Sequence, residues 1–132
     1  WEPLMKKLLL ILLTTILFGQ EDAPTLRELN ADNFNRATSR GLVLVEFWAP
    51  WNEANKVTIL DKWDTFDVKS YRLNIELFPE VQSNNNVVIL PTLIFYDDGE
   101  EVKRIQGDMS FSLKITIDEL EEIVEEILSN KF

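Results

Sequence analysis

The chain has 132 residues and a mass of 15.4 kDa, which is the size of a single domain. Its 13 basic and 23 acidic side chains give a net charge of -10 at pH 7, and so acidic a surface repels the phosphates of nucleic acids. The chain has no cysteine and no histidine. This excludes disulfides, thiolate nucleophiles and thiolate-bound metals, and it removes the usual general base. We expect no cofactor and no metal.

Residues 1–19 carry the pattern of a secretory signal peptide. Two lysines follow Met5, which we take as the initiator with upstream sequence before it, and Leu8–Phe18 forms an apolar run. A helix of this length reaches only about half of the ~30 Å hydrocarbon core, which disfavours a spanning helix. We expect cleavage after Gly19 and an exported mature domain, residues 20–132, that is periplasmic or extracellular with no membrane span. An uncleaved anchor is the alternative.

The mature chain alternates strand and helix patterns, which is typical of an α/β domain. The first half predicts a strand at Thr25–Leu29, a helix at Ala31–Ser39 capped by Asn30 and closed by Gly41, a buried strand at Leu42–Trp48 and a helix at Asn52–Trp63. The second half predicts a strand at Ser70–Glu76, a short helix from Pro79 to the polar run Ser83–Asn86, a hairpin of Thr92–Tyr96 and Glu101–Ile105, and a last helix that starts at the capping box Thr116–Glu119. No repeat or linker divides these elements, so we expect one domain.

The segment Gln106–Ile115, between the hairpin and the last helix, has apolar side chains at alternate positions. They are Met109, Phe111, Leu113 and Ile115. Such alternation fits an extra edge strand as well as an exposed contact surface, and the sequence leaves both interpretations open.

Two motifs within this order of elements resemble the thioredoxin family. The first is Val-Glu-Phe-Trp-Ala-Pro-Trp at Val45–Trp51, which ends the central strand. The second runs from Ile-Leu-Pro-Thr to Asp-Asp-Gly at Ile89–Gly99. The resemblance covers about residues 25–130. It implies a three-layer α/β/α fold with a mixed central sheet, which has five strands in the longer members of the family.

The sequence departs from the family where the family keeps its chemistry. The family's active site reads Trp-Cys-Gly-Pro-Cys-Lys, whereas Trp51–Lys56 reads Trp-Asn-Glu-Ala-Asn-Lys. Thiol–disulfide exchange needs one thiolate to attack and a second thiol to resolve the mixed disulfide. Neither Asn52 nor Asn55 can supply a thiol, so we expect no catalytic residue at these positions and no enzyme of this kind.

Asn52 has two interpretations. Asparagine is among the best N-caps, and the side-chain oxygen of Asn52 can accept a hydrogen bond from the N–H of Asn55 in a helix that starts here. Alternatively, Asn52 is a polar recognition group at the rim of a peptide groove.

The resemblance also implies where such a groove lies. Pro91 aligns with the family's cis-proline, which leaves the backbone of the preceding residue, here Leu90, free to pair with an extended peptide. Trp51 is the natural apolar anchor beside it. The expected binding residues are therefore Trp51, Asn52, Leu90 and Pro91. Packing at the strand end for Trp51 and a structural turn for Pro91 are the alternatives.

Glu46 matches the family's buried acidic residue beneath the second cysteine. A lone buried carboxylate is costly, so we expect Glu46 to pair with Arg72, which aligns with the family's basic residue near that acid, or with Lys56. An unpaired Glu46 would instead have a raised pKa.

These observations predict an exported, redox-inactive thioredoxin-fold protein that binds a protein or an extended peptide at the groove near Trp51 and Pro91. The alternative is a structural subunit whose interface lies elsewhere, on Gln106–Ile115. A thiol–disulfide oxidoreductase is the function that whole-chain similarity alone suggests, and the missing thiols disfavour it.

Overall fold

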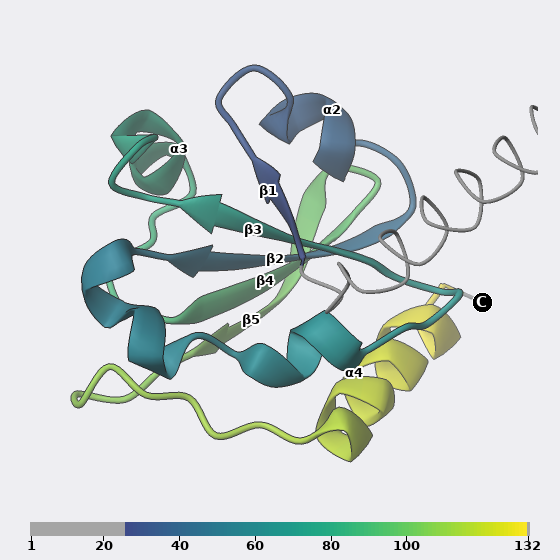
Figure 1. Ribbon diagram of the computed structural model, residues 1–132. Coiled ribbons are helices and arrows are strands. Elements are labelled where there is room, and N and C mark those ends of the chain that lie inside the picture. The colour runs from purple at the N-terminus through teal and green to yellow at the C-terminus, as the bar shows by residue number, and fades with distance from the viewer. Residues whose placement is uncertain (1–25, 132) are drawn as a thin grey trace, which may run out of the picture.

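The computed structural model describes residues 26–131, so the predicted signal peptide lies outside the described residues. Its centre is a mixed sheet in the strand order β1-β3-β2-β4-β5 (Figure 1). β1, β3 and β2 run parallel, whereas β4 is antiparallel to both β2 and β5. The strands are β1 (Arg27–Leu29), β2 (Leu42–Trp48), β3 (Lys69–Asn74), β4 (Thr92–Asp97) and β5 (Glu100–Gln106).

Helical segments cover both faces of the sheet (Figure 1). One face carries α2 (Phe34–Thr38) and α3 (Pro79–Asn84), and the other carries η1 (Pro50–Asn55), η2 (Thr58–Lys62) and α4 (Ile117–Ser129). The three-layer α/β/α fold with a mixed central sheet is thereby confirmed. Within residues 26–131 no helix has the length and apolarity needed to cross a membrane.

The core forms on both sides of the central strand β2. Val43, Val45 and Phe47 pack on the side of α2 and α3. Leu42 and Leu44 pack on the side of η2 and α4. Because both faces are covered, a continuous apolar run is favoured here over an alternating one.

The helix predicted at Asn52–Trp63 is wrong, because this stretch forms two short 3-10 segments, η1 and η2. Between them lies Val57, whose N–H donates to Glu46 Oε2 over 2.9 Å. Its C=O accepts from Arg72 Nη2, also over 2.9 Å. Backbone groups that are engaged in this way are not available to continue an α-helix.

The first helix begins three residues later than predicted, at Phe34 and not at Ala31. Asn30 leads a turn in front of it, in which its Oδ1 accepts bonds of 2.9 Å from the N–H groups of Asp32 and Asn33. Asn30 therefore caps this turn and not the helix itself. The bounds of the five strands agree with the prediction to within two residues.

The last helix starts where the capping box predicted. Thr116 Oγ1 accepts a bond of 3.1 Å from the Glu119 N–H, and Glu119 Oε1 lies 3.1 Å from the same hydroxyl. The residues between β5 and α4 form no strand. The interpretation of Gln106–Ile115 as an extra edge strand is therefore wrong.

Candidate functional site

Three segments of the chain meet at one corner of the sheet. η1 follows the C-terminal end of β2, while Leu90–Pro91 leads into β4. The first residue of β4, Thr92, pairs with Phe47 near the end of β2. On its other side Thr92 pairs with Gln106, the last residue of β5. The chain that leaves β5 at Gly107 therefore starts beside Leu90–Pro91.

Gly107 covers the backbone of the proline turn. The Leu90–Pro91 peptide bond is cis, and both residues are buried. The N–H of Gly107 donates to the Pro91 carbonyl oxygen over 2.8 Å. A Cβ on residue 107 would lie 2.9 Å from the Leu90 carbonyl oxygen, so only glycine fits without a shift. No hydrogen bond among residues 26–131 uses the Leu90 N–H or C=O, so this backbone is unpaired but covered.

Trp51 lies at the surface of this corner and contacts Phe111. The two rings meet edge to face, with 5.2 Å between their centroids and 90° between their planes. Aromatic pairs favour this arrangement because the positive edge of one ring meets the negative face of the other. Trp51 is still 57% exposed. The structure thus places Trp51, the predicted anchor, against Phe111, a residue of the predicted contact surface Gln106–Ile115. From the sequence these were two separate regions.

Asn52 does not cap a helix, so that interpretation is wrong. η1 already begins at Pro50, and Asn52 lies inside it. Its Oδ1 accepts a bond of 2.8 Å from Nδ2 of Asn55, and its own Nδ2 donates to the carbonyl oxygen of Phe111 over 3.1 Å. Asn52 is only 8% exposed. It is therefore a buried link between η1 and the segment after β5, and not an open rim residue.

Exposed apolar side chains surround the corner. Besides Trp51, Val88 is 85% exposed and Met109 is 91% exposed, and Phe111 is partly exposed. Val88 precedes Leu90 by two residues, and Met109 lies in the same segment as Phe111. Of these side chains, Trp51 and Phe111 are in contact, and adjoining exposed apolar side chains mark interaction sites more often than single ones do.

Glu46 and Arg72 face each other across β2 and β3 in the buried middle of the sheet. Arg72 Nε donates to Glu46 Oε1 over 2.9 Å, and Arg72 Nη1 donates to Asp61 Oδ1 over 2.6 Å. Sequence reasoning missed Asp61, because nothing in its sequence neighbourhood shows that η2 aims it at Arg72. Lys56 is not the partner of Glu46, since its Nζ lies 4.4 Å from the centre of the Trp48 ring.

One guanidinium therefore serves two carboxylates, and their pKa values move in opposite directions. Burial raises the pKa of the Glu46 carboxyl above its ordinary value of 4.5, and Arg72 offsets this only in part. For Asp61 the net effect is the opposite. Burial favours a higher pKa, but the hydrogen bonds from Arg72 and from the Leu26 N–H outweigh burial, so the pKa of Asp61 lies below its ordinary value. A raised pKa was expected only for an unpaired Glu46. The paired residue has one because it is the more deeply buried carboxylate of the two.

The corner is equipped for binding through apolar contact and neutral hydrogen bonds. In the described part of the chain, no three Asp or Glu side chains form a group that could hold a metal ion. The side chains at the corner are aromatic, aliphatic or amide. Such groups recognise another polypeptide by packing and by backbone hydrogen bonds, with a tryptophan as a common anchor.

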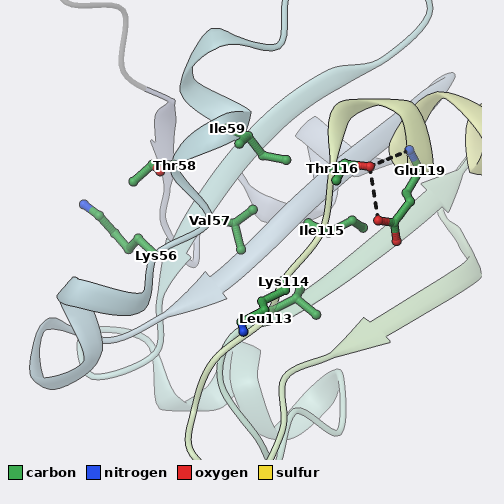
Figure 2. A pocket seen from close by; sticks show the side chains of 9 residues that line it. All are labelled: Lys56, Val57, Thr58, Ile59, Leu113, Lys114, Ile115, Thr116 and Glu119. Carbon is green, nitrogen blue, oxygen red and sulfur yellow. Dashed lines mark hydrogen bonds between the residues drawn. The ribbon is translucent and has the colours of Figure 1, made fainter.

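A shallow groove lies next to the corner, between the junction of η1 and η2 and the residues that lead into α4 (Figure 2). Its volume is about 340 Å³. Val57, Leu113 and Ile115 lie near its middle, while Glu119 is bonded to Thr116 at one side (Figure 2). None of the predicted binding residues lines this groove. Leu113 and Ile115, at the end of the segment after β5, pack here against the part of the core that η2 and α4 cover.

Comparison with known proteins decides the family. The family model described as Thioredoxin matches residues 25–119. The chain belongs to the thioredoxin family. Among its relatives, the thioredoxin of Mycobacterium tuberculosis is 40% identical over 70 residues, covering 49% of this chain and 60% of the relative. The thioredoxin of Chlamydia caviae is 34% identical over 84 residues, covering 60% and 81%. The match thus spans about 60% of the length of the mycobacterial relative.

Solved structures agree with this family at the level of the fold. The thioredoxin of Malassezia sympodialis superposes with a TM-score of 0.61 at 18% identity, covering 78% of this chain and 90% of that one. A designed protein gives a TM-score of 0.60 at 22% identity, covering 80% and 94%. These relatives are named thioredoxin or share its fold, but this member of the family has no thiol for thiol–disulfide exchange.

Proposed function

We propose that this protein is a redox-inactive member of the thioredoxin family that binds a protein or an extended peptide without covalent chemistry. The binding site is the corner formed by Trp51, Val88 and the Leu90–Pro91 turn. The observation that carries the proposal is the exposed indole of Trp51, which lies in η1 three residues after a strand that is buried at every position except its last. An exposed tryptophan beside other apolar side chains is typical of a binding anchor.

The chemistry of the corner supports a particular class of partner. Apolar side chains of the partner would contact Trp51 and Val88, while its backbone would pair with Leu90, as in the addition of a strand to a sheet edge. Glu53 and Asp108 are exposed beside these residues, and the whole chain carries a net charge of -10. We therefore expect an apolar segment flanked by basic residues, because an acidic surface attracts basic partners.

Two other functions receive less support. A structural subunit with its interface on Gln106–Ile115 is favoured by the exposure of Met109. However, Phe111 of that segment contacts Trp51, so the two proposed surfaces adjoin each other. Thiol–disulfide exchange is what the names of the relatives suggest, but this chain has no cysteine with which to perform it.

A defined unfolded polypeptide tests the binding proposal in solution. The probe is a synthetic extended peptide without cysteine, in which an apolar stretch is flanked by lysines, and the readout is the change in amide and indole chemical shifts of the isotope-labelled full chain. We expect shifts at Trp51 and Val88, and weaker binding by Trp51→Ala. Phe66→Ala is the matched control, because Phe66 is fully exposed elsewhere. Equal binding by the wild type and Trp51→Ala would contradict the site.

Export is a separate part of the proposal and rests on the sequence pattern of residues 1–19 alone. The test is the intact mass and the N-terminal sequence of the protein isolated from the cell that makes it. A chain that starts at Gln20 supports a cleaved signal peptide. A chain that starts at Met5 in the membrane fraction supports the uncleaved anchor.

A further inference from the structure

The segment Gly107–Leu113, which we call the strap, crosses the corner between two fixed ends. At its start the Gly107 N–H is bonded to the Pro91 carbonyl oxygen over 2.8 Å. At its end Leu113 packs against the core face that η2 and α4 cover. Figure 1 shows this part of the chain leaving β5, passing η1 and reaching α4. The strap therefore lies across the corner to which the proposed partner would bind.

A hydrogen bond and an aromatic contact join the middle of the strap to η1. The side-chain amide of Asn52 donates to the Phe111 carbonyl oxygen over 3.1 Å, and the Phe111 ring meets the edge of Trp51. Both residues of η1 belong to the stretch that carries the active site in the rest of the family. Asn52 stands where the family has its first cysteine, and here its side chain binds the strap.

Within the strap, polar groups fix one conformation. Asp108 Oδ1 accepts from the N–H groups of Ser110 and Ser112, and the Asp108 N–H donates to the Ser112 carbonyl oxygen over 2.9 Å. Phe111 has a φ of 59°, in the left-handed region that side chains other than glycine disfavour. A strained residue of this kind persists only where its surroundings determine it, as Asn52 and Trp51 do here.

We propose that the middle of the strap is an intramolecular occupant of the binding corner, latched in place by Asn52, which a partner must displace to reach the part of the Trp51 ring that Phe111 contacts. This inference rests on the proposed function and specifies how its site is regulated. The contact that the middle of the strap makes is with Trp51, whose ring meets the Phe111 ring edge to face, whereas at the Leu90 carbonyl oxygen the strap contributes Gly107, its fixed start. The latch is weak because one neutral hydrogen bond and one exposed aromatic contact hold it.

The latch has a consequence for affinity. A site that is open only part of the time binds its ligand more weakly in proportion to the open fraction. A variant that releases the strap should therefore bind an extended polypeptide more tightly than the wild type. A variant that removes a direct contact to the partner should bind it more weakly. Whether Phe111→Ala raises or lowers the affinity therefore shows which role Phe111 has. A higher affinity means that Phe111 blocks the site, and a lower affinity means that Phe111 itself contacts the partner.

Amide hydrogen exchange of the full chain, measured by NMR, tests the latch without any partner. We expect exchange at Gly107, residue 111 and Ser112 to speed up about fivefold in Asn52→Ala, which loses one hydrogen bond, and by a similar factor in Phe111→Ala, which keeps the backbone carbonyl but loses the aromatic contact. Exchange in α4 should stay unchanged, which shows that the variants are folded. Phe66→Ala is the matched control for Phe111→Ala. Unchanged exchange in the strap of both variants would falsify the latch.

Binding of the same lysine-flanked apolar peptide by these variants tests whether the strap occupies the site. We expect Phe111→Ala to bind about fivefold more tightly than wild type, in line with the larger open fraction. Weaker binding would overturn the proposal, because it would make Phe111 part of the surface that the partner contacts. If the strap opens but no variant binds the probe, the proposed function fails and the latch stands. If the probe binds but exchange in the strap is unchanged, the latch fails and the proposed function stands.

Discussion

The side-chain amide of Asn52 donates a hydrogen bond of 3.1 Å to the carbonyl oxygen of Phe111, a residue 59 positions further along the chain. Asn55 donates to Asn52 in turn. Two positions that hold redox-active cysteines elsewhere in the thioredoxin family thus form a short chain of amides in this protein. The replacement removes the thiol chemistry and ties the strap to η1.

Arg72 should contribute strongly to stability, because among residues 26–131 it is the one cation paired with Glu46, and it also binds Asp61. Replacing it in Arg72→Met leaves the buried Glu46 carboxylate without a counter-ion, with the Val57 N–H as its remaining hydrogen-bond donor. We expect the free energy of unfolding to fall by about 3 to 5 kcal/mol, the usual cost of removing one member of a buried pair. Urea unfolding followed by tryptophan fluorescence measures this. Arg40→Met is the matched control on the exposed surface and should change little.

Glu46 should make stability depend on pH in a defined direction. Because burial raises its pKa above 4.5, the folded protein keeps a proton that the unfolded chain has released. The contribution of Glu46 is therefore greatest below about pH 4.5 and declines as the pH rises through the pKa of the folded state. Glu46→Gln imitates the protonated form and removes this dependence.

Urea unfolding of the wild type and of Glu46→Gln over a series of pH values gives the comparison. The unfolding free energy of the wild type, relative to the variant, should fall as the pH increases above about 4.5. Asp61 acts in the opposite direction at lower pH, because its pKa is lowered below 3.8, but it is present in both proteins. A difference that stays constant with pH would show that the Glu46 pKa is not raised.

Thr116 should contribute to the stability of α4 through its hydroxyl. Thr116→Ala leaves the Glu119 N–H without its acceptor, and we expect a loss of about 1 kcal/mol in unfolding free energy. Thr58→Ala is a suitable control, because Thr58 is exposed at the first position of η2 and has no such capping bond. Equal effects of the two substitutions would argue against the cap.

Gly107 should tolerate no side chain. In Gly107→Ala the new Cβ meets the Leu90 carbonyl oxygen at 2.9 Å, and we expect a loss of about 1 to 3 kcal/mol together with chemical-shift changes along the strap. Gly41→Ala separates backbone strain from crowding, since Gly41 has a φ of 69° but open space around its Cα. Its shift changes should stay outside the strap.

Much of the fold could be predicted because the signals are local. The run Leu42–Trp48, the hairpin turn at Asp98–Gly99 and the cap at Thr116 each depend on neighbours within a few residues. The break between η1 and η2 could not be predicted, because it depends on Glu46 and Arg72, which reach Val57 only in the folded chain.

The candidate site shows the same limit. The family resemblance predicts Trp51, Leu90 and Pro91 at one corner, and the pairing of Phe47 with Thr92 puts the end of β2 beside the start of β4. The sequence does not predict that the segment after β5 passes over this corner. Phe111 binds Asn52 through its backbone carbonyl, which every residue has, so no side-chain pattern indicates it. The need for glycine at residue 107 becomes visible only once the Leu90 carbonyl oxygen has a position.

Photo-crosslinking in the cell that expresses the full chain tests the central claim most directly. The crosslinking residue belongs at Val88, which is exposed beside the corner, with a matched probe at Phe66 near the start of β3, the end of the sheet away from the corner. We predict a discrete set of proteins captured from Val88, lost in Trp51→Ala and absent from Phe66, with no need for a disulfide. Capture from Val88 that is unchanged by Trp51→Ala, or capture from Phe66 alone, would contradict non-covalent binding at this corner.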